Sequence, residues 1–138
     1  MTSRRPRSWS LSALAVIAAT SCVPRRDYTP RQIDGARSLA EVMDVQATVA
    51  DRGIEKAGKV AYTDAEWAEL ADTGARIQLT SRKAKAFSRG ADYDALCERL
   101  HASAEKLAAA APIKRVDAAS AALGEMKATC KECHARFK

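Results

Sequence analysis

The stretch that decides the fold class is residues 116–138, VDAASAALGEMKATCKECHARFK, at the C-terminus. Its apolar positions recur at alternating intervals of three and four, which places them on one face of an α-helix. That face consists of Val116, Ala119, Leu123, Met126, Cys130, Cys133 and Phe137. The spacing predicts an amphipathic helix from about Asp117 to the C-terminus, with both cysteines on the side that faces a core.

Three further helices are predicted before this stretch. The first spans about 29–50, after a capping box with proline at the first helical position. The second spans about 63–87, also after a capping box, and the third runs from Asp92, its expected N-cap, until Pro112 stops it. No segment alternates with period two, so nothing supports a sheet. The pattern predicts an all-α fold, an antiparallel up-down-up-down four-helix bundle.

Alanine dominates the apolar content of the chain. Of the 138 residues, 47% are hydrophobic but 5% are aromatic, and 30 are alanine. Alanine side chains bury little area each, so such helices need close packing or a large group to pack around. The length predicts one domain.

The first 21 residues are interpreted as a secretory signal peptide. Three arginines precede an apolar stretch of 11 residues, Trp9 to Ala19, which is too short to span a membrane. The predicted location of the mature protein is therefore the periplasm.

Cys22 follows small residues, and two alternatives stay open for it: ordinary signal peptidase cleavage, or lipidation of Cys22 and a membrane tether. Residues 22–28 are then a tether, and residues 29–138 form the four-helix domain. The leader holds three arginines and no acidic residue, so the net charge falls from +6 to +3 without it. Charges of both signs mix along the chain, which argues against nucleic-acid binding.

Cys130-Lys131-Glu132-Cys133-His134 is the Cys-x-x-Cys-His pattern of covalent haem attachment. On one helical turn the two sulfurs reach the two vinyl groups at one porphyrin edge, and the next residue presents its imidazole to the iron. The pattern predicts one haem c held by Cys130 and Cys133, with His134 as the proximal iron ligand. The predicted export agrees, because haem c is attached outside the cytoplasm.

Two other uses of the cysteines are weighed against haem. A zinc site is one, because a Cys-x-x-x-His pair joins the Cys-x-x-Cys pair in a tetrahedral set of Cys97, His101, Cys130 and Cys133. That set leaves His134 without a role. A thioredoxin-like redox pair is the other, but it needs its cysteines at a helix N-terminus, whereas this pair lies near a C-terminus.

The last nine residues, CKECHARFK at 130–138, resemble the closing motif of class II c-type cytochromes, Cys-Lys-x-Cys-His-x-x-aromatic-basic. This four-helix group contains cytochrome c′ and its low-spin relatives, and the likeness in helix count and length covers about 29–138. The resemblance implies a haem inside the bundle, His134 as the proximal ligand and a first-helix residue over the opposite face. In low-spin members that residue is a methionine ligand; in cytochrome c′ it is an apolar side chain beside a five-coordinate iron.

Met43 is the candidate sixth ligand. The mature chain has two methionines, and Met126 lies eight residues before His134 on the same helix, about 12 Å along its axis. Met43 instead lies on the apolar stripe of the first predicted helix. A five-coordinate iron, and His101 as the sixth ligand, stay open as alternatives.

No catalytic nucleophile, acid–base pair or phosphate-binding loop appears, so the sequence does not predict an enzyme. The predicted function is one-electron transfer with periplasmic redox partner proteins. The alternative is a five-coordinate protein that binds NO or CO, as in cytochrome c′. Basic residues near the motif either dock acidic partners or offset the helix dipole: Lys127, Lys131, Arg136 and Lys138. The family resemblance also implies a homodimer.

Overall fold

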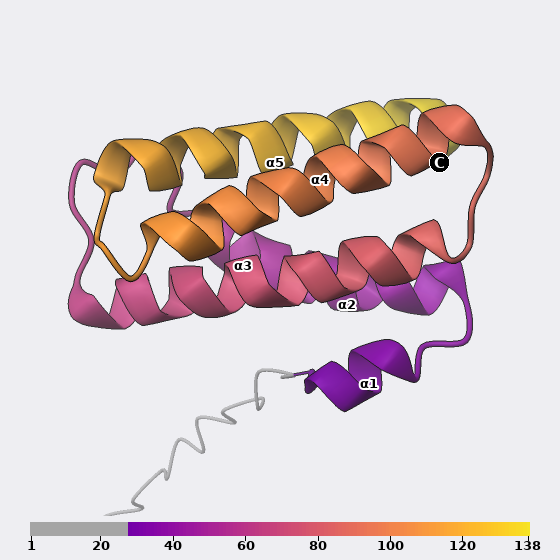
Figure 1. Cartoon of the computed structure of the whole chain (residues 1–138), viewed down its shortest axis with the longest axis horizontal. Coiled ribbons are helices and arrows are strands. Elements are labelled where there is room, and N and C mark those ends of the chain that lie inside the picture. Colours follow the sequence, from indigo (N-terminus) through magenta and orange to yellow (C-terminus); the bar gives the residue numbers. More distant parts are fainter. Residues whose placement is uncertain (1–27) are drawn as a thin grey trace, which may run out of the picture.

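The computed structural model describes residues 28–138, which form four long helices and one short helix (Figure 1). Within this range no residue belongs to a β-strand. The helices are α1 (Pro30–Asp34), α2 (Leu39–Ile54), α3 (Asp64–Lys85), α4 (Ala91–Ala110) and α5 (Val116–Phe137). The predicted all-α fold class is confirmed.

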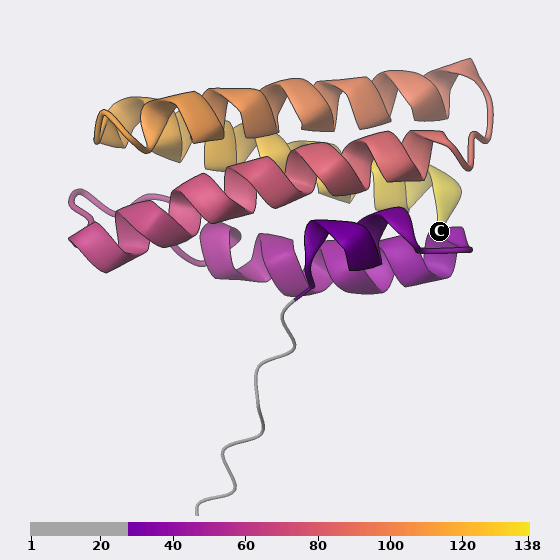
Figure 2. The same cartoon turned by 60° about the horizontal axis from the view of Figure 1, so that its bottom comes forward.

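The four long helices run in alternating directions, as two views of the bundle show (Figures 1 and 2). One end of the bundle, here the loop end, holds the connections 55–63 and 111–115. The other, here the motif end, holds the connections 35–38 and 86–90 and the C-terminus of α5. The predicted up-down-up-down topology is therefore confirmed, and it brings the motif close to the start of α2.

Local capping explains where two helices begin. Thr63 Oγ1 accepts a hydrogen bond from the backbone N–H of Glu66 at 3.3 Å, and Glu66 accepts one from the Thr63 N–H at 2.9 Å. Thr29 and Gln32 form the same reciprocal box at the start of α1. Each box satisfies N–H groups that have no partner inside the helix, as predicted.

The prediction of one helix over 29–50 is wrong. The chain leaves the helix at Gly35 and starts α2 after Ser38, whose hydroxyl accepts a hydrogen bond from the Glu41 N–H at 3.2 Å. Glu41 in turn accepts a hydrogen bond from the Arg37 N–H at 2.6 Å. Ser38 and Glu41 are thus a second capping signal inside the predicted helix, and α2 continues beyond Ala50 to Ile54.

The predicted cap of the third helix is also wrong. Gly90 is the N-cap of α4, with φ of 109°, and no side chain caps this end. Asp92 lies two residues further on, within the first turn of α4, and its carboxylate pairs with Arg136 of α5 instead.

The short N-terminal helix is held on the bundle by its buried Ile33 and by Tyr28, which precedes it. Ile33 is 1% exposed, and the Tyr28 hydroxyl donates to the Asp44 carboxylate on α2 at 3.0 Å. The Arg76 guanidinium on α3 donates to the carbonyl oxygen of Tyr28. Tyr28, the last residue of the predicted tether, is therefore packed against α2 and α3.

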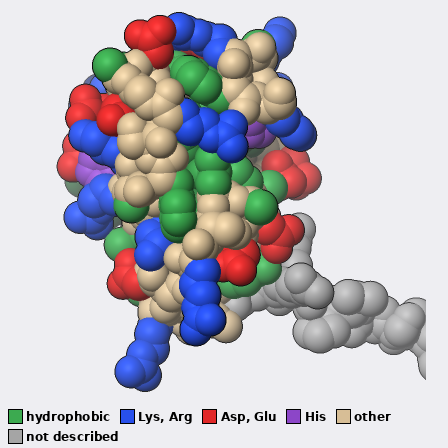
Figure 3. All heavy atoms as spheres, turned by 90° about the vertical axis from the view of Figure 1, so that its right-hand side faces the viewer, with side chains coloured by type: hydrophobic (Ala, Val, Ile, Leu, Met, Phe, Trp, Pro, Cys, Tyr) green, Lys and Arg blue, Asp and Glu red, His purple; other side chains and the backbone are tan. Residues whose placement is uncertain are grey.

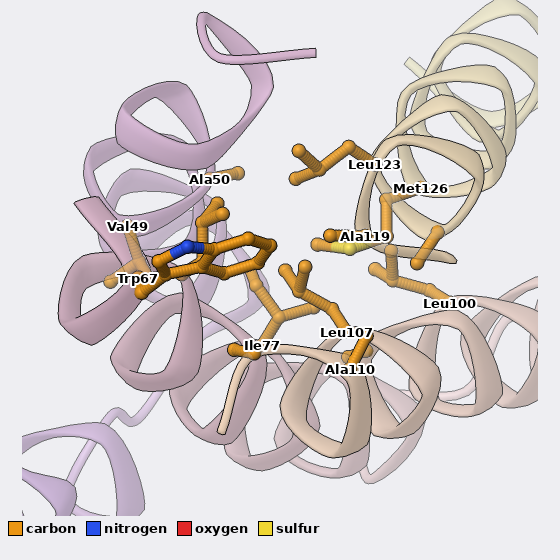
Figure 4. Close-up of a cluster of buried hydrophobic side chains, with 14 of the residues drawn as sticks. Val49, Ala50, Trp67, Ile77, Leu100, Leu107, Ala110, Ala119, Leu123 and Met126 are labelled. Carbon is orange, nitrogen blue, oxygen red and sulfur yellow. The ribbon is translucent and has the colours of Figure 1, made fainter. Parts of the chain in front are cut away.

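The main hydrophobic cluster fills the middle and the loop end (Figure 4). Trp67 lies between α2 and the other helices, where Val49, Leu107 and Leu123 surround it. Alanines fill the gaps, and Gly74 lets α3 approach α4 closely: an added Cβ would lie 2.8 Å from the backbone nitrogen of Ala108. Close helix packing thus compensates for the small side chains at this end.

In the described range no helix is long and apolar enough to cross a membrane. The predicted signal peptide, residues 1–21, and Cys22 lie outside the described residues.

Candidate functional site

The last turns of α5 carry the motif at the motif end of the bundle. Cys130 and Cys133 are half-buried, and the next residue, His134, is exposed. The prediction that both thiols face inward agrees with their packing, because each contacts a hydrophobic cluster. Cys130 joins the main cluster, and Cys133 joins a smaller cluster at the motif end.

All three motif residues line one cavity of about 30 Å³. Every long helix contributes to its wall. The other lining residues are Met43 and Gln46 from α2, Ala84 from α3, Tyr93, Leu96, Cys97 and Leu100 from α4, and Thr129 from α5. The wall is mainly apolar, with thiols, a thioether and a carboxamide among its polarisable and polar groups.

Met43 reaches this cavity from α2, whereas Met126 does not line it. Met126 is fully buried in the main hydrophobic cluster, as expected for a residue that packs. Met43 is half-buried and packs in the smaller cluster beside Cys133. The bundle therefore brings the predicted sixth-ligand candidate to the same cavity as the motif.

Gln46 lines the cavity, although the sequence did not lead us to predict it as a site residue. It occupies an apolar position on the stripe of α2, three residues after Met43, and it is 8% exposed. A polar side chain at a core position of an amphipathic helix was the available signal, because buried amides need partners. Its oxygen Oε1 has no hydrogen-bond partner among residues 28–138.

The surroundings of the thiols favour their protonated forms. Burial raises the pKa of Cys130, and the neighbouring Cys133 raises it further, while a hydrogen bond from Gln46 opposes this rise. Burial also raises the pKa of Cys133, although Arg89 and Arg136 oppose the change. These thiols are therefore not activated nucleophiles of the thioredoxin kind.

Cys97 of α4 is a third thiol in the cavity wall. It is 7% exposed, and burial raises its pKa to about 11. The Tyr93 hydroxyl hydrogen-bonds Cys97 and also lies 3.3 Å from the carbonyl oxygen of Ala84, to which it donates. Burial raises the pKa of Tyr93 as well.

The zinc set predicted as an alternative is not assembled. His101 is absent from the cavity wall, and its Nδ1 lies 3.1 Å from the carbonyl oxygen of Gln78 and 3.2 Å from the Ser81 hydroxyl. Between residues 28 and 138, no three His, Cys, Asp or Glu side chains are grouped to hold a metal ion. The tertiary contacts of His101 with α3 turn it away from the cysteines, so it is not placed as an iron ligand either.

The face of the motif end is apolar at its centre and charged around it (Figure 3). Half-buried Leu39, Met43, Phe87 and Phe137 belong to the smaller cluster at this end. Arg136 pairs with Asp92 and Glu132, while Lys127, Lys131 and Lys138 are exposed. Part of the predicted basic group is thus neutralised by acidic neighbours.

The donor chemistry of this cavity fits a covalent haem. Two inward thiols one helical turn apart, followed by an imidazole, face an apolar wall and a thioether on the opposite helix. Its volume of about 30 Å³ is small beside the roughly 300 Å³ or more of small-molecule pockets. The cavity is far smaller than a porphyrin, so the donor set and the apolar wall, rather than the volume, carry the fit to haem.

Comparison with known proteins agrees with this chemistry. A family model described as Cytochrome C' matches residues 37–138, which include α2 to α5 and the motif. Neither curated proteins nor solved structures gave a match to the chain. The family match covers most of the chain, and the resemblance to class II c-type cytochromes is confirmed: the chain belongs to the cytochrome c′ family.

Proposed function

We propose that the protein is a monohaem c-type cytochrome that transfers single electrons in the periplasm. The observation that carries this proposal is the convergence of Cys130, Cys133 and His134 from α5 with Met43 from α2 on one cavity. Haem c, which the family implies, supplies a one-electron Fe(III)/Fe(II) couple when bound.

In this proposal the cysteine sulfurs of Cys130 and Cys133 hold the cofactor as thioethers. His134 supplies the proximal nitrogen, and its position beside Cys133 at the exposed edge of the bundle supports that role. The apolar side chains of Leu96 and Leu100 exclude water from the site. When water is excluded, less energy is needed to reorient polar groups as the charge of the site changes, and this suits an electron carrier.

Met43 is proposed as the sixth ligand because it faces the motif from α2 and Met126 does not. The matched test replaces each of them by leucine, which removes the thioether with little change in volume. Met43→Leu is expected to convert a low-spin optical spectrum to a high-spin one, and Met126→Leu to leave it unchanged. Identical spectra of Met43→Leu and the unaltered protein would remove Met43 from this role.

The second candidate is a five-coordinate protein that binds NO or CO. The packing of Met43 among apolar side chains supports it, because a methionine that only fills space leaves the iron open. Carbon monoxide separates the two functions: prompt binding to the reduced protein rules out the six-coordinate carrier. A colourless product from cells with intact haem attachment rules out both.

Transport, partners and assembly complete the proposal. Export by the leader, with Cys22 either unmodified or lipidated, is tested by the mass of the mature N-terminus and by fractionation. Exposed Lys127, Lys131 and Lys138 are proposed to contact acidic redox partners, so electron transfer should slow as ionic strength rises. A homodimer is proposed from the family, and sedimentation tests it.

A further inference from the structure

The most unusual side chain of the cavity wall is Gln46. Its relative exposure is 8%, and its carbonyl oxygen Oε1 has no hydrogen-bond partner within residues 28–138. A buried polar group without a partner destabilises the folded state, and an apolar residue of the same shape avoids this cost. Leucine or methionine at this position would therefore pack better, so the carboxamide needs an explanation.

The two ends of the Gln46 carboxamide have different surroundings. A hydrogen bond from Gln46 would favour the thiolate of Cys130 and so opposes the rise of its pKa, and only the amide NH₂ end can donate such a bond. Gln46 lines the same wall as Cys133, His134 and Met43, and its carbonyl oxygen is buried without a hydrogen-bond partner among the described residues. The carbonyl, with its partial negative charge, is thus the unpaired end of a cavity-lining side chain.

The hydroxyl groups of the same wall already form hydrogen bonds with other partners. Thr129 donates its proton to the carbonyl oxygen of Glu125 at 2.8 Å and accepts from Arg99 at 3.2 Å. Tyr93 donates to the carbonyl oxygen of Ala84. Neither hydroxyl donates a hydrogen bond to the Gln46 oxygen. The dipole of the Gln46 carbonyl is therefore left to act on a group bound in the cavity.

We infer that Gln46 tunes the reduction potential of the site, by directing its carbonyl oxygen at the cofactor and favouring the more positive, oxidised state. This inference rests on the proposed function. Hydrogen bonds, burial and fixed dipoles near a haem are levers on its potential. A dipole counts for more in a buried, mainly apolar wall than in water, because the local dielectric response is weaker.

The test compares two glutamine-to-leucine variants of the full protein by redox titration. Gln46→Leu removes the dipole and should raise the midpoint potential. At a fixed applied potential the ratio of reduced to oxidised protein should rise between about twofold and tenfold. This range corresponds to the net free energy of one hydrogen bond. Gln78→Leu on α3 is the matched control, because Gln78 does not line the cavity, and its ratio should not change.

Two further measurements separate tuning from a structural role. The optical spectrum of Gln46→Leu should keep its coordination state, and its melting temperature should be equal or higher, since a buried unpaired oxygen is removed. Gln46→Asn keeps a shorter carboxamide and should give an intermediate potential. If Gln46→Leu does not accumulate, Gln46→Asn alone tests the inference. A raised midpoint potential in Gln46→Asn supports the tuning role, and an unchanged or lowered one overturns it.

The outcomes distinguish this inference from the proposed function. An unchanged or lowered potential in Gln46→Leu, in protein that carries covalent haem, overturns the tuning role and leaves the cytochrome proposal intact. Absence of covalent haem from the unaltered protein overturns both. Equal shifts in Gln46→Leu and Gln78→Leu also contradict the inference, because they report a general change in the bundle.

Discussion

The two ends of the bundle are built differently. Around Trp67 the main cluster has, in the described part of the chain, 16 buried side chains, most of them aliphatic or alanine, and nine partly buried hydrophobic residues pack against it (Figure 4). The motif-end cluster has a core of Ala36, Val42, Ala84, Tyr93 and Cys97, and half of its members are only partly buried. Gln46, whose buried oxygen is unpaired within residues 28–138, lines the cavity beside this cluster.

Stability and the site are therefore supplied mainly by separate parts of one bundle. Tight apolar packing contributes most of the folding free energy, and it is concentrated toward the loop end. Thiols, a thioether and an unpaired amide pack less well, but they give the motif end groups that bind and tune a cofactor. Substitutions and chemical modification at the two ends test this division.

Trp67→Ala should destabilise the protein most. Trp67 is 6% exposed, and the centroid of its ring lies 4.7 Å from that of Tyr62 in an edge-on arrangement. Truncation of this buried side chain to alanine opens a large cavity. The expected loss is about 3–5 kcal/mol in the free energy of unfolding, measured by chemical denaturation. Trp67→Phe is the control and should lose less. A loss below about 1 kcal/mol for Trp67→Ala would show that the loop end is not the stabilising part.

Cys97 should react slowly with iodoacetamide while the protein is folded. Its pKa of about 11, against an ordinary value of 9.0, lowers the thiolate fraction at pH 8 about 100-fold. Because the folded-state pKa is raised, this thiol stabilises the fold below about pH 9 and loses that effect as the pH rises toward 11. Peptide mapping after timed alkylation checks the rate, with denatured protein as the reference. Equal rates in the two states would contradict the burial of this thiol.

Gly74→Ala should separate α3 from α4. An added Cβ meets the Ala108 nitrogen at 2.8 Å and the Ala104 carbonyl oxygen at 3.0 Å, and backbone atoms cannot yield as a side chain does. The expected cost is about 1–3 kcal/mol. Gly124→Ala is the matched control, since nothing lies within 4 Å of its added Cβ, and it should be neutral or stabilising by up to about 1 kcal/mol. Thermal unfolding of both variants is compared. A lower melting temperature of Gly74→Ala alone indicates a steric effect, whereas a similar decrease in both indicates an effect of losing glycine.

Thr63→Ala should have the smallest effect. It removes the reciprocal capping box at the loop-end start of α3 and should cost about 1 kcal/mol. Thr63→Ser keeps the hydroxyl and serves as the control. Since the cap lies far from the motif, hydrogen exchange should increase in the first turn of α3 and not around Cys133. Increased exchange at both ends would indicate that they unfold as one unit.

Much of the fold could be predicted because its signals are local. The Thr63–Glu66 box, the three-four spacing of α5 and the stop before Pro112 act between residues close in sequence. The break between α1 and α2 was also local, in the Ser38–Glu41 cap, but a longer apolar stripe masked it. The N-terminus of α4 escaped prediction because Gly90 caps it by backbone conformation alone, without a side-chain signal.

The amino-acid sequence was enough to predict the four long helices in outline, their order and the attachment motif, since periodicity, caps and motif spacing are properties of neighbouring residues. The tertiary structure decided which distant groups share the cavity: it brought Met43 and Gln46 to the motif and turned His101 toward Gln78 of α3. Burial and partnering of a side chain depend on how separate helices pack, and the pattern along one helix does not contain that information. For this reason Cys130, Cys133 and His134 were found as a candidate site from the sequence, whereas the unpaired oxygen of Gln46 emerged only from the packed bundle.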